Sequence, residues 1–116
     1  HSAAVSCLCG LDPANCIPPL TPYFIMKIGQ LPLVPYHRPG DKALGDVIKT
    51  LAAKHSAVLL ANHGPVVSGP DLEGAIYASE ELEETAKIFL LVGNRPVNCL
   101  NAEQIDDLKQ AFKLDF

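Results

Sequence analysis

The first residue whose type and position could do chemistry is His63, in the segment Asn62-His63-Gly64-Pro65. It follows the apolar run Ala57–Ala61, which has the length of a strand buried on both faces. Strand ends and the loops after them are where α/β domains place ligands. The imidazole could bind a metal ion, or it could hydrogen bond a backbone carbonyl as an ordinary buried histidine. A metal needs three or four ligands, and no H-x-H or H-E-x-x-H motif supplies them, so the residues alone favour the buried histidine.

Tyr23 is the second candidate, because a phenol can donate a proton to a developing charge. A core aromatic side chain on a strand is the simpler interpretation of the same residue. Tyr36, His37 and Arg38 form a polar cluster before Pro39-Gly40, and Arg38 could hold a phosphate or carboxylate. One arginine without a glycine-rich phosphate loop is weak evidence for such a site, so we expect a solvent-facing turn.

The four cysteines are Cys7, Cys9, Cys16 and Cys99. None forms a C-x-x-C pair, and their spacing is neither that of a zinc finger nor that of a small disulfide framework. We therefore expect reduced, mostly buried thiols in a cytoplasmic protein. The first residues show no basic and apolar leader pattern, so no secretory signal is expected.

Proline and hydrophobic periodicity indicate the elements that must position these residues. Seven of the ten prolines precede residue 40, so that stretch cannot hold a long helix. The longest periodic segment contains Glu80, Glu81, Glu83 and Glu84, which we interpret as a solvated helix face. The predicted elements are a short helix near residue 3, strands at Tyr23–Ile28 and Leu33–Tyr36, a helix from Asp41 to about Lys54, strands at Ala57–Ala61 and Val66-Val67, a helix from Asp71 to Val92, an extended piece at Val97–Leu100 and a helix after Asn98 or Asn101.

Composition narrows the class of protein. A chain of 116 residues with 48% apolar residues can bury the core of one domain. Nine Lys and Arg residues against thirteen Asp and Glu residues, with no basic cluster, disfavour nucleic-acid binding. The longest aliphatic runs have five residues, so no membrane span is expected. The order of elements predicts a layered α/β or α+β domain with a thin sheet.

Together these motifs resemble the class II aldolase/adducin family. The residues that carry the resemblance are Leu59–Val67, Gly69-x-Asp71-Leu72, Ala75 and Glu81–Lys87. They match the C-terminal half of the family's domain and span nearly all of this chain. Within the family, the 3-oxo-tetronate 4-phosphate decarboxylases are similar at Gly10–Cys16, Leu20–Phe24 and Val34–Asp41. L-fuculose-phosphate aldolase is a more distant relative.

The resemblance implies a three-layer α/β/α domain around a mostly antiparallel central sheet, assembled as a homotetramer with active sites between subunits. Residues 1–116 would be the C-terminal portion of one such domain, with its N-terminal part missing. The missing part would carry the acid/base residue and the residues that hold the substrate phosphate. We therefore expect the isolated chain to be inactive.

The resemblance also assigns the site. The family holds a divalent metal, usually zinc, with three histidines, two from an H-x-H motif and one from an N-H-G loop. His63 matches the loop histidine, and the metal would stabilise an enediolate. Tyr23 matches a tyrosine that reaches a neighbouring subunit's site as proton donor in the aldolases. His1 could be a histidine of the H-x-H motif, but the alignment places it three residues beyond, so we expect both of those ligands to precede the chain.

Four functions are therefore open. The first is a metal-dependent lyase that decarboxylates a small phosphorylated sugar acid, a 3-oxo-tetronate 4-phosphate. The second is an aldolase or epimerase of the same family, acting on a sugar phosphate. The third is an adducin-like assembly domain that would contain no metal. The fourth is a soluble α/β domain in which His63 is a core residue.

Overall fold

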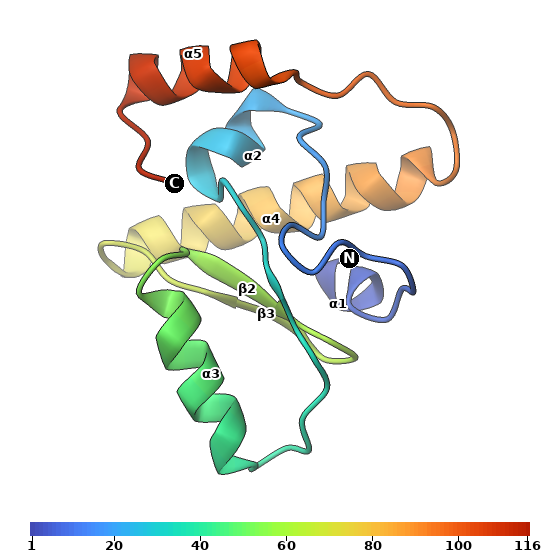
Figure 1. Ribbon diagram of the computed structural model, residues 1–116, viewed down its shortest axis with the longest axis vertical. Coiled ribbons are helices and arrows are strands. Elements are labelled where there is room, and N and C mark those ends of the chain that lie inside the picture. The colour runs from blue at the N-terminus through green and yellow to red at the C-terminus, as the bar shows by residue number, and fades with distance from the viewer.

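The computed structural model describes all residues from His1 to Phe116 (Figure 1). Its elements in chain order are α1 (Ser2–Val5), α2 (Pro22–Lys27), β1 (Leu33–Val34), α3 (Lys42–Ala52), β2 (Ala57–Leu60), β3 (Gly64–Val67), α4 (Leu72–Val92) and α5 (Ala102–Phe112). None of the helices is both long enough and apolar enough to cross a lipid bilayer.

The three strands form one mixed sheet in the order β1-β2-β3. Strand β1 runs parallel to β2, with Leu33 opposite Leu59, and helix α3 makes the crossover that a parallel pair requires. Strands β2 and β3 are antiparallel, with Leu60 opposite Gly64. All four residues of β2 are buried, as its uninterrupted apolar sequence predicts for a central strand.

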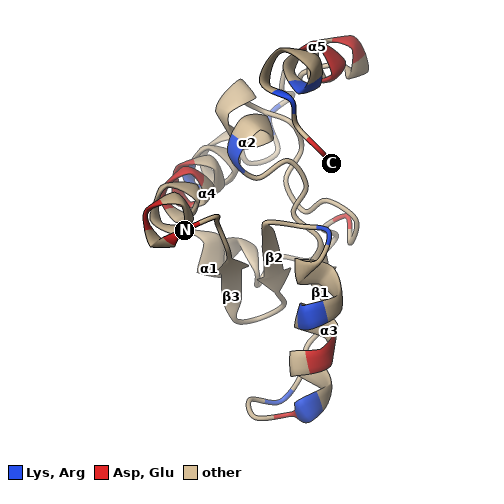
Figure 2. Cartoon of the chain, turned by 90° about the vertical axis from the view of Figure 1, so that its left-hand side faces the viewer, with Lys and Arg blue, Asp and Glu red and all other residues tan.

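Helices cover both faces of this sheet. On one face, Val34, Val58 and Leu60 pack against the apolar stripe of α3. On the other, Leu59 belongs to a larger core that includes Leu82 of α4. Figure 2 shows the strands lying between α3 and α4. The predicted three-layer α/β/α arrangement is therefore confirmed.

The segment Tyr23–Ile28 is not a strand, as its aromatic and β-branched residues suggested, but helix α2. The Thr21 hydroxyl accepts a hydrogen bond from the Phe24 N–H at 3.3 Å, and Pro22 occupies the first helical turn. A threonine cap followed by proline favours a helix start strongly enough to override β propensity. Helix geometry then turns Phe24 inward and leaves Tyr23 62% exposed, so Tyr23 is not a core aromatic residue.

The three longer helices follow their predicted boundaries closely. The side chains of Asp41, Asp71 and Asn101 each cap a helix by accepting a backbone N–H, and Gly93 ends α4. Strand β1 stops at Val34, ahead of Pro35, and Val97–Leu100 forms no strand. Capping side chains and proline thus account for most of the element ends.

Gly69 lies where the chain passes from β3 into α4. A Cβ atom there would lie 2.5 Å from the backbone nitrogen of Ala75 and 2.8 Å from the carbonyl carbon of Gly74. Since helix backbone cannot move aside as a side chain does, we expect Gly69→Ala to lower the free energy of unfolding by about 1–3 kcal/mol. Urea denaturation measures this difference. Gly45→Ala in α3, where a Cβ meets nothing within 4 Å, is the control and should be neutral or stabilising; equal losses at both positions would contradict the argument.

All four cysteines are free, but the expectation of mostly buried thiols is wrong for Cys7 and Cys9, which are exposed. Both follow the short helix α1, in a segment without further regular structure. Cys16 is buried, and burial, reinforced by the charge of Asp12, raises the pKa of its thiol to about 11. The four thiols therefore differ sharply in expected reactivity.

At pH 8 about one Cys16 thiol in a thousand is ionised, so its reaction with iodoacetamide should be slow. We expect Cys7 and Cys9 to be alkylated at least about 100-fold faster than Cys16 in the folded chain. Mass spectrometry that assigns each modified cysteine measures the rates. Unfolding in urea should make the rates similar, and equal rates in the folded chain would refute the prediction.

Candidate functional site

His63 lies in the tight turn that joins β2 to β3. Residues 61–63 form this turn, with Asn62 in the left-handed region at φ 60° and the His63 N–H bonded to the Leu60 carbonyl at 3.1 Å. Asparagine adopts this conformation more readily than most residues, and Gly64 at φ 155° continues the reversal. The His63 side chain is exposed, so its interpretation as a buried core histidine is wrong. The imidazole of His63 is therefore accessible to a ligand at this end of the sheet.

A chain of contacts holds the turn in place. The Asn62 N–H donates to the Ser6 carbonyl at 2.8 Å, which ties the turn to the end of α1. At the start of α1, the Glu83 carboxylate accepts hydrogen bonds from the Ser2 N–H and hydroxyl. The position of His63 therefore depends on α4 through α1.

The ionisation state of the Glu83 carboxyl group favours its hydrogen bonds to the start of α1. Partial burial by itself would raise the pKa of its carboxyl group. Hydrogen bonds from the Ser2 N–H and hydroxyl act in the opposite direction and lower this pKa. Glu83 is thus ionised at neutral pH and able to satisfy the backbone donors at the start of α1.

A metal ion needs at least three protein ligands, and this chain does not gather them. No group of three or more His, Cys, Asp or Glu side chains that could hold a metal ion is formed by residues 1–116. His1 belongs to no such group. The residues present therefore do not fit a complete metal site, and His63 could supply one ligand only.

The fold does not bring Tyr23 to His63 within one chain. Tyr23 lies in the first turn of α2, which contacts α4 and α5 (Figure 1). The other end of α2 meets the start of β2, where the Ser56 hydroxyl donates to the Ile28 carbonyl at 3.3 Å. His63 follows the opposite end of β2. A site using both residues would have to combine two chains.

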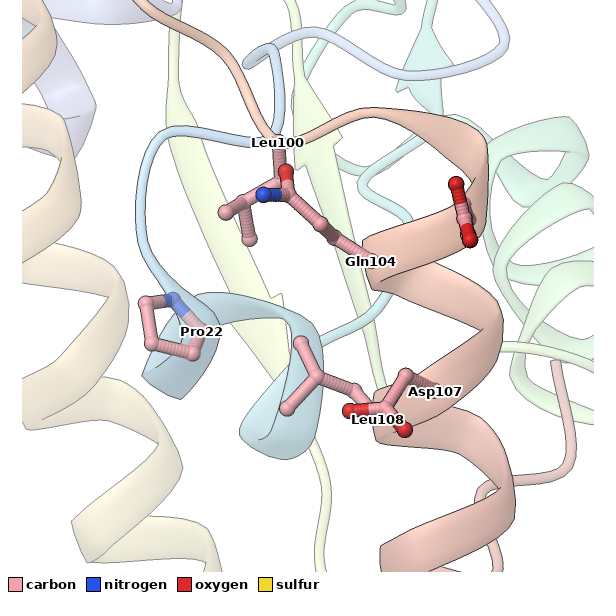
Figure 3. Close-up of a pocket in the computed structure, with 6 residues that line it drawn as sticks. Pro22, Leu100, Gln104, Asp107 and Leu108 are labelled. Carbon is pink, nitrogen blue, oxygen red and sulfur yellow. The ribbon is translucent and has the colours of Figure 1, made fainter.

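A surface cavity of about 470 Å³ lies between α2 and α5 (Figure 3). Its lining residues are Pro22, Leu100, Glu103, Gln104, Asp107 and Leu108. It contains two carboxylates and no histidine, cysteine or basic group, and neither predicted site residue lines it. This cavity is therefore separate from the candidate site.

Tyr36 and Arg38 are exposed, and the His37 Nδ1 atom lies 3.6 Å from a carboxylate oxygen of Asp41. This segment is the solvent-facing turn that its sequence predicted. This turn does not bring together the several positively charged side chains that an anion-binding site needs.

Comparison with known proteins identifies the family to which this arrangement belongs. The family model described as Class II Aldolase and Adducin N-terminal domain matches residues 1–90. This chain belongs to the class II aldolase and adducin family. The resemblance seen in the sequence is thereby confirmed.

The proteins that are similar to this chain in sequence or structure are named for different reactions. The chain is 53% identical over 108 residues to the 3-oxo-tetronate 4-phosphate decarboxylase of Escherichia coli strain K12, covering 93% of this chain and 51% of the relative. The crystal structure of Escherichia coli YgbL superimposes on this chain with a TM-score of 0.89 at 53% identity, over 93% of this chain and 52% of that one. YgbL is described there as an aldolase/epimerase/decarboxylase, so its description names three reactions. An L-fuculose 1-phosphate aldolase superimposes with a TM-score of 0.77 at 28% identity, over 97% of this chain and 51% of that one. The chain thus spans about half the length of these relatives.

The sequence does not reveal the contact between Glu83 and Ser2, which holds α1 beside the His63 turn. The run of glutamates predicts a solvated face, whereas the Glu83 carboxylate also accepts hydrogen bonds from Ser2 at the start of α1. The two partners are about eighty positions apart, so no local pattern could reveal the contact. The match of residues 1–90 to the family also shows that α5 lies beyond the part the family model describes.

Proposed function

We propose that this chain is the C-terminal part of a lyase domain that decarboxylates a 3-oxo-tetronate 4-phosphate. In this reaction the C1–C2 bond breaks, C1 leaves as carbon dioxide, and a proton adds to C2. The electron pair of the broken bond is held between C2 and the C3 oxygen as an enediolate until that proton arrives. Charge on the C3 oxygen must be stabilised, because it develops in the transition state. A divalent metal ion, which we propose to be zinc, supplies such stabilisation when it is bound.

The observation that carries this proposal is the 53% identity to the 3-oxo-tetronate 4-phosphate decarboxylase of Escherichia coli. Identity to the L-fuculose 1-phosphate aldolase is 28% over a similar share of the chain. Within one fold, substrate and reaction follow the residues of the site rather than the architecture. The higher similarity therefore favours the decarboxylase over the aldolase.

In this proposal His63 provides one metal ligand, and the other ligands come from residues outside this chain. Its exposed side chain, in a turn held by Ser6 and Leu60, supports that role. A ligand presented from a restrained turn loses little conformational freedom on binding. Because one histidine cannot hold a metal alone, we propose that the 116-residue chain is inactive by itself.

We propose that Tyr23 donates a proton to the site of a neighbouring subunit in a homotetramer. Its exposure and its distance along the fold from His63 support a role outside its own chain. A phenol on a short, capped helix is held in a defined direction. The substrate partner in this proposal is a small phosphorylated sugar acid.

The test uses a joined chain, in which the part of the Escherichia coli decarboxylase outside the match is placed ahead of residues 1–116. We expect the joined chain to contain about one zinc ion per chain and to release carbon dioxide from a 3-oxo-tetronate 4-phosphate. The 116-residue chain alone should contain no zinc and show no activity. Metal analysis and a carbon dioxide assay provide the two readouts.

Other outcomes would distinguish the alternatives. Cleavage of L-fuculose 1-phosphate, with no decarboxylation, would show an aldolase and overturn the proposal. A folded joined chain that holds no metal and acts on neither substrate would indicate an assembly domain. Zinc bound by the 116-residue chain alone would show that its ligands lie among the residues described here, against the proposed division of the site.

A further inference from the structure

Cys7 and Cys9 are a pair of exposed thiols that follow α1. Only Leu8 separates them, and its side chain is 44% exposed, so solvent reaches this whole segment. Cys99 is half-buried, and Cys16 is buried with its pKa raised to about 11, so neither competes with the pair for a reagent in solution. The proposed decarboxylation uses neither exposed thiol, which leaves the pair free for another role.

Two cysteines separated by one residue lie within reach of a disulfide bond. A disulfide joins residues whose Cα atoms are about 4.4–6.8 Å apart. Two successive Cα–Cα steps of about 3.8 Å place Cys7 and Cys9 no more than about 7.5 Å apart, and closer wherever the chain bends. The chain turns at Cys7 and bends at Cys9. The two sulfur atoms can therefore meet through local rotations that leave the core in place.

The reduced pair makes contacts at the end of α1 that ring closure changes. The Cys7 thiol donates a hydrogen bond to the Ala3 carbonyl at 3.5 Å, in the preceding turn. The Leu8 N–H donates to the Val5 carbonyl at 3.0 Å. A bond between the sulfur atoms turns the Cys7 side chain towards Cys9 and closes a small ring that includes the Leu8 nitrogen. We therefore expect both contacts to be lost when the disulfide forms.

These contacts lie beside the hydrogen bond that holds the His63 turn. The Ser6 carbonyl, which accepts the Asn62 N–H at 2.8 Å, shares one peptide plane with the Cys7 nitrogen. Helix α1 has only four residues and lies against β3 (Figure 1), so few other bonds fix its end. A helix this short has little stability of its own and frays when its last bonds are lost. Fraying at Ser6 frees the Asn62 N–H and, with it, the His63 turn.

We propose that Cys7 and Cys9 form a reversible disulfide that releases the His63 turn from α1. The oxidant is a small disulfide such as oxidised glutathione. One protein thiolate attacks a sulfur atom of the oxidant and expels a thiolate, and the second protein thiolate then attacks the mixed disulfide and expels the other. Two protein thiols and one small disulfide thus become one protein disulfide and two small thiols, which carry the two protons.

The exposure of the pair makes the reaction reversible. Exposed or strained disulfides are reduced more readily than buried structural ones, so an excess of the reduced small thiol should restore both cysteines. The two states would differ in how firmly the His63 turn is held. This proposal concerns the turn itself and holds whichever reaction the protein catalyses.

Mass spectrometry tests the disulfide. The joined chain defined above is incubated with oxidised glutathione, and we expect the peptide that contains Cys7 and Cys9 to lose two hydrogen atoms and to regain them with reduced glutathione. Cys99→Ser should form the disulfide at an unchanged rate. Cys9→Ser should instead stop at a glutathione adduct on Cys7. Stable adducts on both cysteines of the parent, or a disulfide that links two chains, would overturn the proposal.

Amide hydrogen exchange tests the effect on the turn. We expect the Asn62 amide to exchange at least about 10-fold faster in the oxidised than in the reduced joined chain. The Leu59 N–H, which donates to the Pro32 carbonyl at 2.9 Å, is the internal control and should not change. In Cys9→Ser with its adduct, Asn62 should stay slow, because no ring forms.

Two exchange results would contradict the proposal. A disulfide that leaves Asn62 as slow as in the reduced chain would show that the turn is not released. Faster exchange at both Asn62 and Leu59 would show a general loss of stability rather than a local release. Neither the mass nor the exchange measurement depends on metal content or carbon dioxide, so this proposal and the proposed function can fail separately.

Discussion

Replacing His63 with glutamine in the joined chain is expected to abolish zinc binding and to lower kcat/KM for decarboxylation by more than about 100-fold. Loss of a residue that merely supports a metal ligand costs about 10- to 100-fold, so loss of the ligand itself should cost more. Glutamine is close to histidine in size, and the side chain is exposed, so the fold should be unaffected. Metal analysis and steady-state kinetics measure the two losses.

His55→Gln is the matched control for this experiment. His55 follows α3 near the start of β2, at the end of that strand opposite to His63, and its N–H bonds to the Leu51 carbonyl at 2.9 Å. The same chemical change there should leave metal content and activity within about twofold of the parent. A His63→Gln variant that keeps its zinc would show that the ligands lie elsewhere.

Replacing Leu82 with alanine is expected to lower the free energy of unfolding by about 2–5 kcal/mol. Leu82 is 1% exposed and lies in the core that α4 shares with Leu59 of the central strand and Phe24 of α2. Neighbours drawn from three elements cannot all move inward to fill the space left by the side chain, so most of the cavity should persist. Urea denaturation of the joined chain measures the change.

Leu91→Ala provides the comparison for Leu82. It is the same substitution on the same helix, at a largely exposed position, and should change the free energy of unfolding by less than about 0.5 kcal/mol. A loss at Leu82 no greater than that at Leu91 would mean that α4 does not pack on the sheet as described. Loss of cooperativity in the unfolding curve would instead show that the variant no longer unfolds in one step.

Much of the fold could be predicted because its strongest signals are local. The apolar run of β2, the periodicity of α4 and the caps Asp41 and Asp71 all act within a few residues. The composition of Tyr23–Ile28 predicts a strand, but Thr21 and Pro22 before it favour the helix that the structure shows. The cap was visible in the sequence, so this element was predictable in principle.

The candidate site was less accessible to sequence reasoning. The position of His63 after β2 singles it out, but the residues alone favour a buried side chain, and only the family resemblance implies a metal role. The exposure of His63 and the contact between Asn62 and Ser6 arise from tertiary packing. The role of Glu83 likewise depends on a partner distant in sequence, which no periodic pattern encodes.

Helix α3 differs from α4 in how firmly it is held, because none of its residues is fully buried. It packs only on the face of the sheet formed by Val34, Val58 and Leu60. Segments with so little buried surface open at a free-energy cost well below that of global unfolding. When α3 opens, the connection between β1 and β2 becomes a long loop, and loop entropy grows only slowly with length, so the strands can remain paired. We therefore expect α3 to open more readily than α4, while the His63 turn stays bonded to Ser6.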